Sequence, residues 1–408
     1  MVGKRGIALI MAMFLIFVLT ILSASFFSGV INENKLVRRH VNSTCALWLA
    51  EAGVQKGIWK MNNYDNQWNI SEWMPIQSET NAYESKEPEV FNQVGNFEVE
   101  IKGIGSNEPV IRSYGYIPFD DGQVYDKNSI NYAKRIVEIG IFKNTFHYGI
   151  AAKDSIVMGG NATTDSYNSS SPYGGSNVSQ NGDIATNGDI NMNGSGGYVY
   201  GDASIGPDGT FSNSAQVSGQ ITHQSDLLFI PVAVPQNIIT LKNEGNLKNT
   251  PKPLTGNHYF SSIKLSSPGD QLVINGPANI YISGALSISG SAMITIAGSG
   301  PVAVYVGGNA SISGQGIANT SQIPSNFILY GCGTGTKIDL TGQTNFFGAV
   351  YAPESDIKIS GQTFNIYGSI FGKTVDIQGN GYIHYDERLN DIKYGEKKYT
   401  MQKWQEVF

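Results

Sequence analysis

The feature that most constrains this chain is an apolar run near its N-terminus. Residues 7–27 contain only three polar side chains, all hydroxyls, and as a helix they would cross about 30 Å of hydrocarbon. The run exceeds the roughly 7–15 residues of a secretory signal peptide, which stays the alternative, with residues 23–25 as its only candidate cleavage site. Lys4 and Arg5 precede the run and predict a cytoplasmic N-terminus with the body outside. We therefore expect a retained, single-pass helix in the cytoplasmic membrane.

The helical pattern continues beyond the apolar run. Residues 30–61 are amphipathic, with apolar side chains spaced among charged ones, and no proline appears before Pro75. One helix over residues 7–61 would be about 80 Å long, with half of it in the bilayer and half protruding. A helix that is apolar first and amphipathic later suits a subunit that moves from a membrane into the helical core of a filament.

Two short motifs on this helix carry a family resemblance. Residues 5–10 read RGIALI and residues 49–53 read LAEAG. With the apolar helix between them, they resemble the N-terminal domain of PilX-type minor pilins over about residues 1–60. The resemblance implies packing with other pilins and minor pilins through this helix. The residues that it assigns to packing in the filament are Met11, Ala50, Glu51, Ala52 and Gly53.

The resemblance also implies proteolytic processing. Lys4, Arg5 and Gly6 resemble the end of a prepilin leader, residues 1–6, which prepilin peptidase would remove to leave Ile7 as the first residue. Major pilins have Glu at the fifth mature position, where this chain has Met11. In the family that carboxylate is thought to neutralise the amino terminus of a neighbouring subunit, so a subunit without it suits the tip or the initiating position. A plain signal anchor on a surface protein is the alternative.

Three segments of alternating apolar residues follow the helix. They lie at residues 97–101, 110–117 and 135–141, after a polar stretch over residues 62–90 that we interpret as loops. Alternation predicts strands with one buried and one solvated face, as in an antiparallel sheet. We expect residues 62–145 to form the sheet of a small α+β pilin-like domain.

From residue 148 the sequence becomes rich in glycine and asparagine. Over the whole chain glycine makes up 48 of 408 residues, charged residues 15% and hydrophobic residues 41%, which favours a folded, mostly-β body with tight turns. One motif recurs: two apolar residues at alternate positions, then glycine two residues later. It describes one short face of a parallel β-solenoid (β-helix) coil, with a glycine corner. The copies lie at residues 190–194, 280–284, 286–290, 294–298, 310–314, 338–342, 357–361 and 375–379.

A second repeat gives the length of one coil. Strand-like segments centre on Tyr281, Tyr305, Leu329, Tyr351 and Phe371, at steps of 24, 24, 22 and 20 residues. Periods in this range are typical of solenoids. We expect four regions in this part of the chain. They are a first solenoid part over residues 148–223, an irregular, proline-rich connection over 224–275, a second solenoid part over 276–390, and a terminal strand or cap over 391–408.

The C-terminal region carries a second resemblance. Residues 347–353 read FGAVYAP, residues 368–370 read GSI, and residues 383–387 read IHYDE. These pieces resemble a domain often found behind PilX-type N-termini, over roughly residues 275–390. The function of that domain is poorly defined, so the resemblance supports the fold more than an activity.

An enzyme is the rival class, because some β-solenoids cleave carbohydrates with two carboxylates about 5–10 Å apart. Asp339, Lys358 and Asp376 occupy equivalent outward positions on successive coils, but a lysine between two carboxylates favours a solvated charge ladder. The five histidines show no spacing typical of metal ligands, and we interpret His384 as packing around the end of the solenoid. We expect no enzyme activity, no cofactor and no metal.

These observations favour a structural role at the cell surface. A net charge of −6 argues against nucleic-acid binding, which needs a basic face. The leading hypothesis is a membrane-anchored minor pilin of a type IV pilus system that displays its solenoid at or near the filament tip. The alternative is an adhesin whose solenoid binds a surface or a polysaccharide, with residues 167–173 as the place to look. Cys45 and Cys332 are too few for a disulfide framework.

Overall fold

Two compact units make up the chain. The computed structural model describes residues 3–63, 73–85, 89–91, 95–104, 109–118 and 132–407, apart from 195, 214–215, 224, 249–251, 315, 343–344 and 395–398. Side chains are described from residue 9 onward, except those of residues 89–91. The helix–sheet unit comprises Met1–Lys143 and Tyr399–Phe408, and the solenoid unit comprises Asn144–Lys398.

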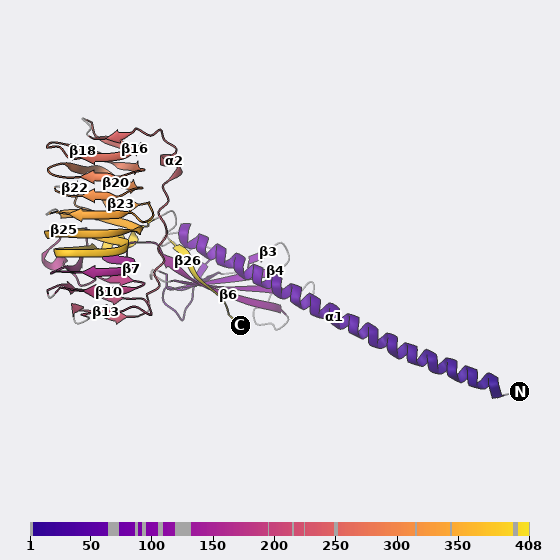
Figure 1. Cartoon of the computed structure of the whole chain (residues 1–408). Coiled ribbons are helices and arrows are strands. Elements are labelled where there is room, and N and C mark those ends of the chain that lie inside the picture. Colours follow the sequence, from indigo (N-terminus) through magenta and orange to yellow (C-terminus); the bar gives the residue numbers. More distant parts are fainter. Residues whose placement is uncertain are drawn as a thin grey trace. The chain divides into compact units, whose positions relative to one another are not determined.

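The helix–sheet unit combines one long helix with an antiparallel sheet (Figure 1). Helix α1 covers Gly3–Asn63, close to the predicted residues 7–61. The strand order is β1-β2-β4-β5-β6-β26, and β3 pairs with β4. The bounds are β1 Trp73–Pro75, β2 Tyr83–Ser85, β3 Glu89–Phe91, β4 Gly95–Lys102, β5 Val110–Pro118, β6 Tyr132–Lys143 and β26 Tyr399–Val407. The three predicted strands are confirmed as β4, β5 and β6, whereas β1 and β2 lie in the region that was predicted as loops.

The second half of α1 packs on this sheet because apolar or small residues recur every three or four positions and so share one face. The buried ones include Ala46, Leu49, Ala50, Gly53 and Val54. Glycine permits a close approach here. A Cβ on Gly53 would collide with Ser113, and a Cβ on Gly115 of β5 would collide with the backbone of Ala46. A larger residue at either glycine would push the helix off the sheet.

Of the two alternatives for the C-terminal residues, a terminal strand or a cap, β26 is a strand. This strand pairs antiparallel with β6 and is part of the helix–sheet unit. Its first residue, Tyr399, is buried in the same core as Ala50 and Ile139. The carboxylate of Glu406 contacts the guanidinium of Arg135 on β6. The buried Tyr399 and this ion pair therefore both hold β26 in the sheet.

The solenoid unit is inserted in the chain between two paired strands, since β6 ends at Lys143 and β26 begins at Tyr399. The two ends of the solenoid unit also lie side by side within that unit. Thr145 forms an antiparallel bridge with Lys393, and the backbone N–H of Tyr394 donates to the carbonyl of Asn144 at 3.0 Å. Adjacent ends are what a domain insertion requires.

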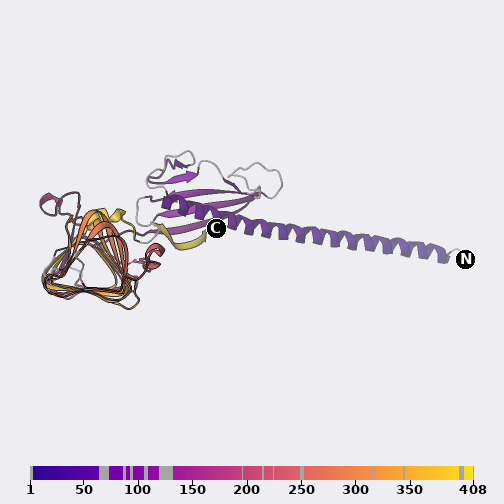
Figure 2. The ribbon, with the colours of Figure 1, turned by 90° about the horizontal axis from the view of Figure 1, so that it is seen from above.

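Parallel strands build the solenoid unit, as predicted. They stack into three faces, and Figure 2 shows the resulting three-sided outline. In the first part of the chain the strands are β7 Ile150–Met158, β8 Thr163–Tyr167, β9 Ile184–Thr186, β10 Asp189–Met192, β11 Tyr198–Val199, β12 Ala203–Ser204, β13 Phe211–Ser212 and β14 Ile221–Thr222. The later strands are β15 Asn246–Leu247, β16 Leu254–Phe260, β17 Ser262–Leu265, β18 Gln271–Ile282, β19 Leu286–Ile288, β20 Met293–Val306, β21 Ala310–Ile312, β22 Gly316–Asn319, β23 Phe327–Gly331, β24 Lys337–Thr341 and β25 Asn345–Asp386.

The coils come from two stretches of chain that meet in the middle of the stack. Strands β7–β14 extend in one direction, since β7 pairs with β9 and β10, which pair in turn with β12 and β13. The chain then resumes at β15, and β15–β25 return coil by coil until β25 pairs with β7 and β8. In Figure 1 the yellow β25 lies beside the magenta β7. The connection is shorter than the predicted residues 224–275, because β15–β17 lie within that range.

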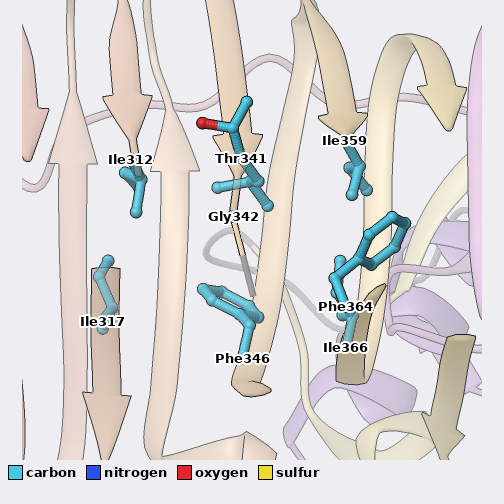
Figure 3. A pocket seen from close by; sticks show the side chains of 9 residues that line it. Ile312, Ile317, Thr341, Gly342, Phe346, Ile359, Phe364 and Ile366 are labelled. Atoms are coloured by element: carbon cyan, nitrogen blue, oxygen red, sulfur yellow. The ribbon is translucent and has the colours of Figure 1, made fainter. Parts of the chain in front are cut away.

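Isoleucine and other branched residues fill the interior. Five residues that the repeat places inward are at most 8% exposed, which confirms the coil assignment. They are Ile288, Ile312, Leu340, Ile359 and Ile377. A gap of about 30 Å³ lies between side chains that include Ile312, Leu340 and Ile359. Figure 3 shows Ile312, Ile359 and other residues that line it. Among the described residues that line this gap, Thr341 has the one polar side chain, so the gap is a packing defect and not a ligand site.

Glycine forms the corner that follows the repeated motif. Gly290, Gly314, Gly342 and Gly379 have φ values of +67°, +72°, +124° and +106°, a region that other residues rarely adopt. The corners also stack closely, since a Cβ on Gly314 would collide with the backbone of Gly290 below it. The glycine therefore serves both the turn and the approach of neighbouring coils.

Candidate functional site

The first half of α1 exposes its apolar side chains. From Leu9 to Val30 the large hydrophobic residues that the structure describes are all at least 37% exposed, and Met11 is 68% exposed. By length and composition the helix could cross a membrane, a test that a signal sequence also passes. This half contributes nothing to the core of the helix–sheet unit.

An exposed apolar stripe continues along the second half of α1. Val37, Val41 and Trp48 are 61%, 51% and 63% exposed, and Trp59 is 54% exposed. At 100° per residue these four positions fall within about 40° of one another on the helix. The sheet-facing residues, such as Ala46 and Gly53, lie on the opposite side. We call Val37, Val41, Trp48 and Trp59 the helix stripe.

The residues predicted for processing and for filament packing lie in different environments in the structure. The side chains of Lys4, Arg5, Gly6 and Ile7 lie outside the described residues. Ala50 and Gly53 are buried against the unit's own sheet, so their predicted role in packing between subunits is corrected to packing within one. Glu51 is exposed and Ala52 is half-buried, and their role stays a prediction, as does that of Met11.

Tyrosines form a column along one outer face of the solenoid. Tyr259, Tyr281, Tyr305, Tyr330 and Tyr351 are register partners on successive coils. The predicted ladder contained Leu329 in place of Tyr330, which is wrong by one residue. Leu329 faces Val304 and Val350 and points inward, with no exposed surface. A slip of one residue moves a side chain to the other face of a strand.

Two of the five tyrosines in this column, Tyr330 and Tyr351, are buried. The hydroxyl of Tyr351 donates to the carbonyl of Ile230 at 2.7 Å and accepts from its N–H at 2.9 Å. The ring of Tyr394 stacks on that of Tyr351 at 4.1 Å, and Phe146 meets it edge-on. Tyr351 is only 2% exposed, and this burial raises its pKa well above the usual range. We call the five tyrosines the covered column, and its covered part is a second core.

A second aromatic column stands on another outer face. The rings of Phe347 and Tyr367 are nearly parallel, at 4.3 Å and 7°. Tyr367 in turn stacks on His384 at 4.7 Å, and Tyr382 lies parallel to that histidine at 5.9 Å. Phe347 and Tyr367 are half-buried. We call Phe347, Tyr367 and His384 the open column.

The loop after β8 brings one more tyrosine to the open column. Tyr173 lies 3.9 Å from the ring of His384, and its hydroxyl donates to Asp165 at 2.7 Å. The other oxygen of Asp165 lies 2.6 Å from Nδ1 of His384. Asn177 holds the loop by donating to three carbonyls, those of Asn168, Ser171 and Pro172.

His384 therefore does more than pack at an end. It pairs with Asp165 of β8 in the middle of the stack, where the two stretches of chain meet, so its predicted place at the end of the solenoid is corrected. It is 4% exposed, because Tyr173 and Tyr367 cover it. Asp165 is a partner that the sequence did not indicate, since it lies 219 residues away.

A cleft of about 410 Å³ opens over this column. Its aromatic lining comes from Phe347, Tyr367, Tyr167 and Tyr173. Serines 169–171 and Pro172 line one side, and Ser321, Gln322 and Ile323 line the other, with Asn345 completing the set. All twelve lining residues are uncharged at neutral pH. The cleft thus combines an aromatic floor with polar, neutral sides.

Buried polar groups lie beside the cleft. Tyr167 is 2% exposed, and its hydroxyl has no hydrogen-bond partner among the described residues. Burial raises its pKa, with the nearby Asp386 carboxylate adding to the shift. Asp386 has no exposed surface, and burial raises the pKa of its carboxyl as well. Its Oδ1 accepts from the backbone N–H groups of Ser169 and Arg388, which ties the loop after β8 to the end of β25.

The other predicted groups do not assemble into a site. Asp339 and Lys358 are register partners, as the charge ladder requires, and on the next strand along the stack Asp376 has Val157 of β7 as its register partner. Within the described ranges no three His, Cys, Asp or Glu side chains are grouped to hold a metal ion. Cys45 and Cys332 are free thiols.

The sequence contained one signal for the cleft. Tyrosines 167 and 173 were singled out, and both line it. Phe347 and Tyr367 were missed, although their spacing of 20 residues matches one coil and could have placed them in one column. Gln322 was missed because nothing in the sequence places residues 321–323 beside the loop after β8.

Comparisons with known proteins match one part of the chain to a family. Residues 213–392 match a domain of unknown function, DUF7305, which spans the second stretch of the solenoid. No curated protein matches the chain. Among solved structures the competence-associated pilin ComZ from Thermus thermophilus matches at 10% identity and a TM-score of 0.27, over 90% of this chain and 98% of that one. That TM-score is too low to show a common fold, so the architecture rests on the strand pairings above.

Proposed function

We propose that this chain is a minor pilin-like structural protein of a type IV pilus system, anchored in the cytoplasmic membrane by α1. The helix–sheet unit is the assembly module, and α1 packs with other pilins and minor pilins. The observation that carries the proposal is the helix stripe. It continues the apolar surface of the first half of α1 onto a segment whose opposite face is already committed to its own sheet.

The physical argument is one of surface area. A soluble unit gains nothing by exposing two valines and two tryptophans along one line of a helix, and exposed apolar surface gathered in this way marks an interaction site. A partner that buries Trp48 alone would gain about 1.5–3 kcal/mol. A helix from another subunit fits such a narrow stripe, because helices pack through single rows of side chains.

The test replaces the exposed aromatic side chain with a charge. Trp48→Glu should lower recovery of the protein in sheared surface filaments at least tenfold, without changing its thermal unfolding. Trp404→Glu is the matched control, since Trp404 of β26 is 46% exposed in the same unit but lies off the helix. Equal recovery of both variants would contradict assembly through the stripe.

We also propose that prepilin peptidase cleaves after Gly6. The basic pair Lys4 and Arg5 followed by Gly6 supports this, as does the apolar helix that begins at Ile7. N-terminal sequencing of the mature protein should read from Ile7. An intact Met1, or a start near Ser25, would remove the pilin proposal.

The proposed position is the filament tip or an initiating complex. Met11 stands where repeated pilins have a carboxylate, and a buried carboxylate is costly unless it is paired, so its loss suits a place that needs no such pairing. The solenoid unit is also larger than the helix–sheet unit and too bulky to repeat at every step of a thin filament. Quantitative labelling should find few copies near one end. Uniform decoration along the shaft would contradict this placement.

A second candidate function is adhesion through the solenoid, and the cleft over the open column favours it. The two functions are compatible, because one concerns the helix–sheet unit and the other the solenoid unit. A carbohydrate-cleaving activity would need paired carboxylates at the cleft, whereas none of its lining residues is charged. Incubation of the protein with polysaccharides should therefore release no reducing ends.

A further inference from the structure

We propose that the cleft over the open column is a binding site for a neutral saccharide. The inference rests on the second candidate function, adhesion, and names its site and the class of its ligand. It concerns Tyr167, Tyr173, Phe347 and Tyr367, with neutral polar groups on both sides.

The lining chemistry selects the ligand class. A saccharide presents apolar C–H faces and many hydroxyls, so it needs aromatic surface and neutral hydrogen-bonding groups together. The cleft has both, with four aromatic residues, and hydroxyl or amide side chains from the serines, Gln322 and Asn345. A phosphate, a polyanion or a charged peptide would find no charged partner among the lining residues. A volume of about 410 Å³ lies within the usual range for small-ligand sites, about 300–1,000 Å³.

The aromatic floor is rigid. Tyr167, Tyr173 and Tyr367 each meet the other two edge-to-face, with centroids 5.5–5.9 Å apart. The Tyr173 hydroxyl is held by Asp165, and Tyr367 is held between Phe347 and His384. Side chains that are already ordered lose little entropy when a ligand contacts them, so binding costs less.

Both sides of the cleft are also fixed in advance. On one side Asn177 ties down the serine loop with three hydrogen bonds. On the other, Asn319 donates to the carbonyls of Ile323 and Phe347 at 2.9 and 3.1 Å, which joins the side to the floor. Gln322 at this edge has a φ of +54°, a conformation that side chains other than glycine rarely adopt. The turn thus keeps an exposed amide side chain at a strained position.

In the covered column, aromatic rings from successive coils also stack, and part of the column is buried. Stacking by itself therefore does not explain the cleft at the open column. Tyr330 and Tyr351 are stabilised by burial under other parts of the same unit. At the open column no segment within the described ranges fills the space between the two sides. The buried Tyr167 hydroxyl, which has no partner among those residues, adds a polar group beside the floor.

The test measures binding of neutral oligosaccharides to the full chain in a detergent that has no sugar headgroup. The probes are tetrasaccharides of glucose, mannose and N-acetylglucosamine, with heparin and polygalacturonate as charged counterparts, followed by calorimetry and saturation-transfer NMR. We expect at least one neutral probe to bind and neither polyanion to bind at this site. Binding of the polyanions in place of every neutral saccharide would overturn the inference, as would binding of none of the probes.

Two variants locate the binding. Tyr367→Ala should weaken it at least tenfold, the loss of about 1.4 kcal/mol. Ser170→Trp should do the same by filling the cleft; Ser170 is exposed, so this variant folds even if Tyr367→Ala does not. Tyr281→Ala, a half-buried tyrosine on the covered column, is the matched control and should leave affinity within twofold. Equal weakening by Tyr281→Ala would overturn the assignment to this cleft.

The test of the saccharide site and the test of the pilin proposal give independent results. The Tyr367→Ala and Ser170→Trp variants should enter filaments as the unaltered protein does, since they touch only the solenoid unit. Loss of assembly in Trp48→Glu with intact saccharide binding supports both proposals. Intact assembly in Trp48→Glu removes the stripe argument and leaves the cleft untouched.

Discussion

The two aromatic columns of the solenoid unit both place rings from successive coils against one another, and they differ in what lies over them. Tyr305 stacks on Tyr330 at 4.8 Å in the covered column, and Phe347 stacks on Tyr367 at 4.3 Å in the open column. The covered column ends beneath Ile230 and Tyr394, and Tyr351 there is 2% exposed. The open column is covered only in part, by Tyr173, and borders a cleft.

This difference shows that a stack of aromatic rings can serve either as buried core or as a surface open to a ligand. In the covered column the hydroxyl of Tyr351 is bonded to backbone groups of a crossing segment, so this end of the column acts as core. In the other the rings face neutral polar side chains across open space, so they are available to a ligand. The path of the connecting segments decides between these roles, and each of the following predictions tests it.

The largest effect is expected for the interior that both columns share. Ile359→Asp places a carboxylate among apolar side chains with no partner and should cost more than about 4 kcal/mol, which unfolds the solenoid unit. Circular dichroism and thermal unfolding would measure it. Lys358→Ala, at the exposed neighbouring position, should melt as the unaltered protein does. A normal melting curve for Ile359→Asp would mean that the coil assignment is wrong.

The next effect separates the two columns. Tyr351→Ala should destabilise the solenoid unit by about 3–5 kcal/mol, because it empties a buried aromatic site. Tyr367→Ala removes the same side chain from the half-buried column and should cost about 1–2 kcal/mol, since less surface returns to water. Urea unfolding of both variants measures the difference. Equal losses would show that the open column is core as well.

A smaller effect isolates the hydroxyl groups. Tyr351→Phe leaves the ring and removes both hydrogen bonds to Ile230, so the buried backbone groups lose a partner and stability should fall by about 1–3 kcal/mol. Tyr367→Phe should change stability by less than about 0.5 kcal/mol. If the two phenylalanine variants unfold at the same urea concentration, the covering segment contributes nothing through Tyr351.

The smallest effect concerns Asp386, which sits beside the open column. Burial raises the pKa of its folded-state carboxyl above the unfolded value, so the folded protein loses stability as pH rises through the interval between them. Asp386→Asn keeps an oxygen for the two backbone N–H groups and carries no charge. The stability of the unaltered protein relative to this variant should therefore improve as pH falls from 7 toward about 4. Unfolding midpoints that shift in the opposite direction would contradict the burial argument.

Much of the fold was predictable because local patterns reflect it. The alternation at residues 97–101 predicts β4, and the repeated motif predicts that the side chains of Ile312 and Ile359 point inward. The register of Tyr330 was not predictable, because the coil from Tyr305 to Tyr330 has 25 residues and includes a short helical turn, Pro324–Asn326. An irregular corner of this kind shifts the count by one.

The site was predictable only in part, because its pieces come from distant segments. Tyr173 stood out as an aromatic residue in a polar loop, but its partners Asp165 and His384 are joined by the pairing of β8 with β25. No periodicity within either stretch indicates that the last strand of the second stretch pairs with the first strands of the first. The same reason explains why the pairing of β26 with β6 was not predicted.

The insertion of the solenoid unit between β6 and β26 has a mechanical consequence. Both of its ends lie in the middle of the stack, next to β7 and the end of β25. Part of the cleft lining comes from β25 and from β8 and the loop after it, and these two strands pair with each other beside the same two ends. A pull exerted at the cleft therefore reaches the two attachment points through a few coils, and is shared between two backbone connections. The outer strands, from β12 to β14 and from β15 to β21, lie off this path.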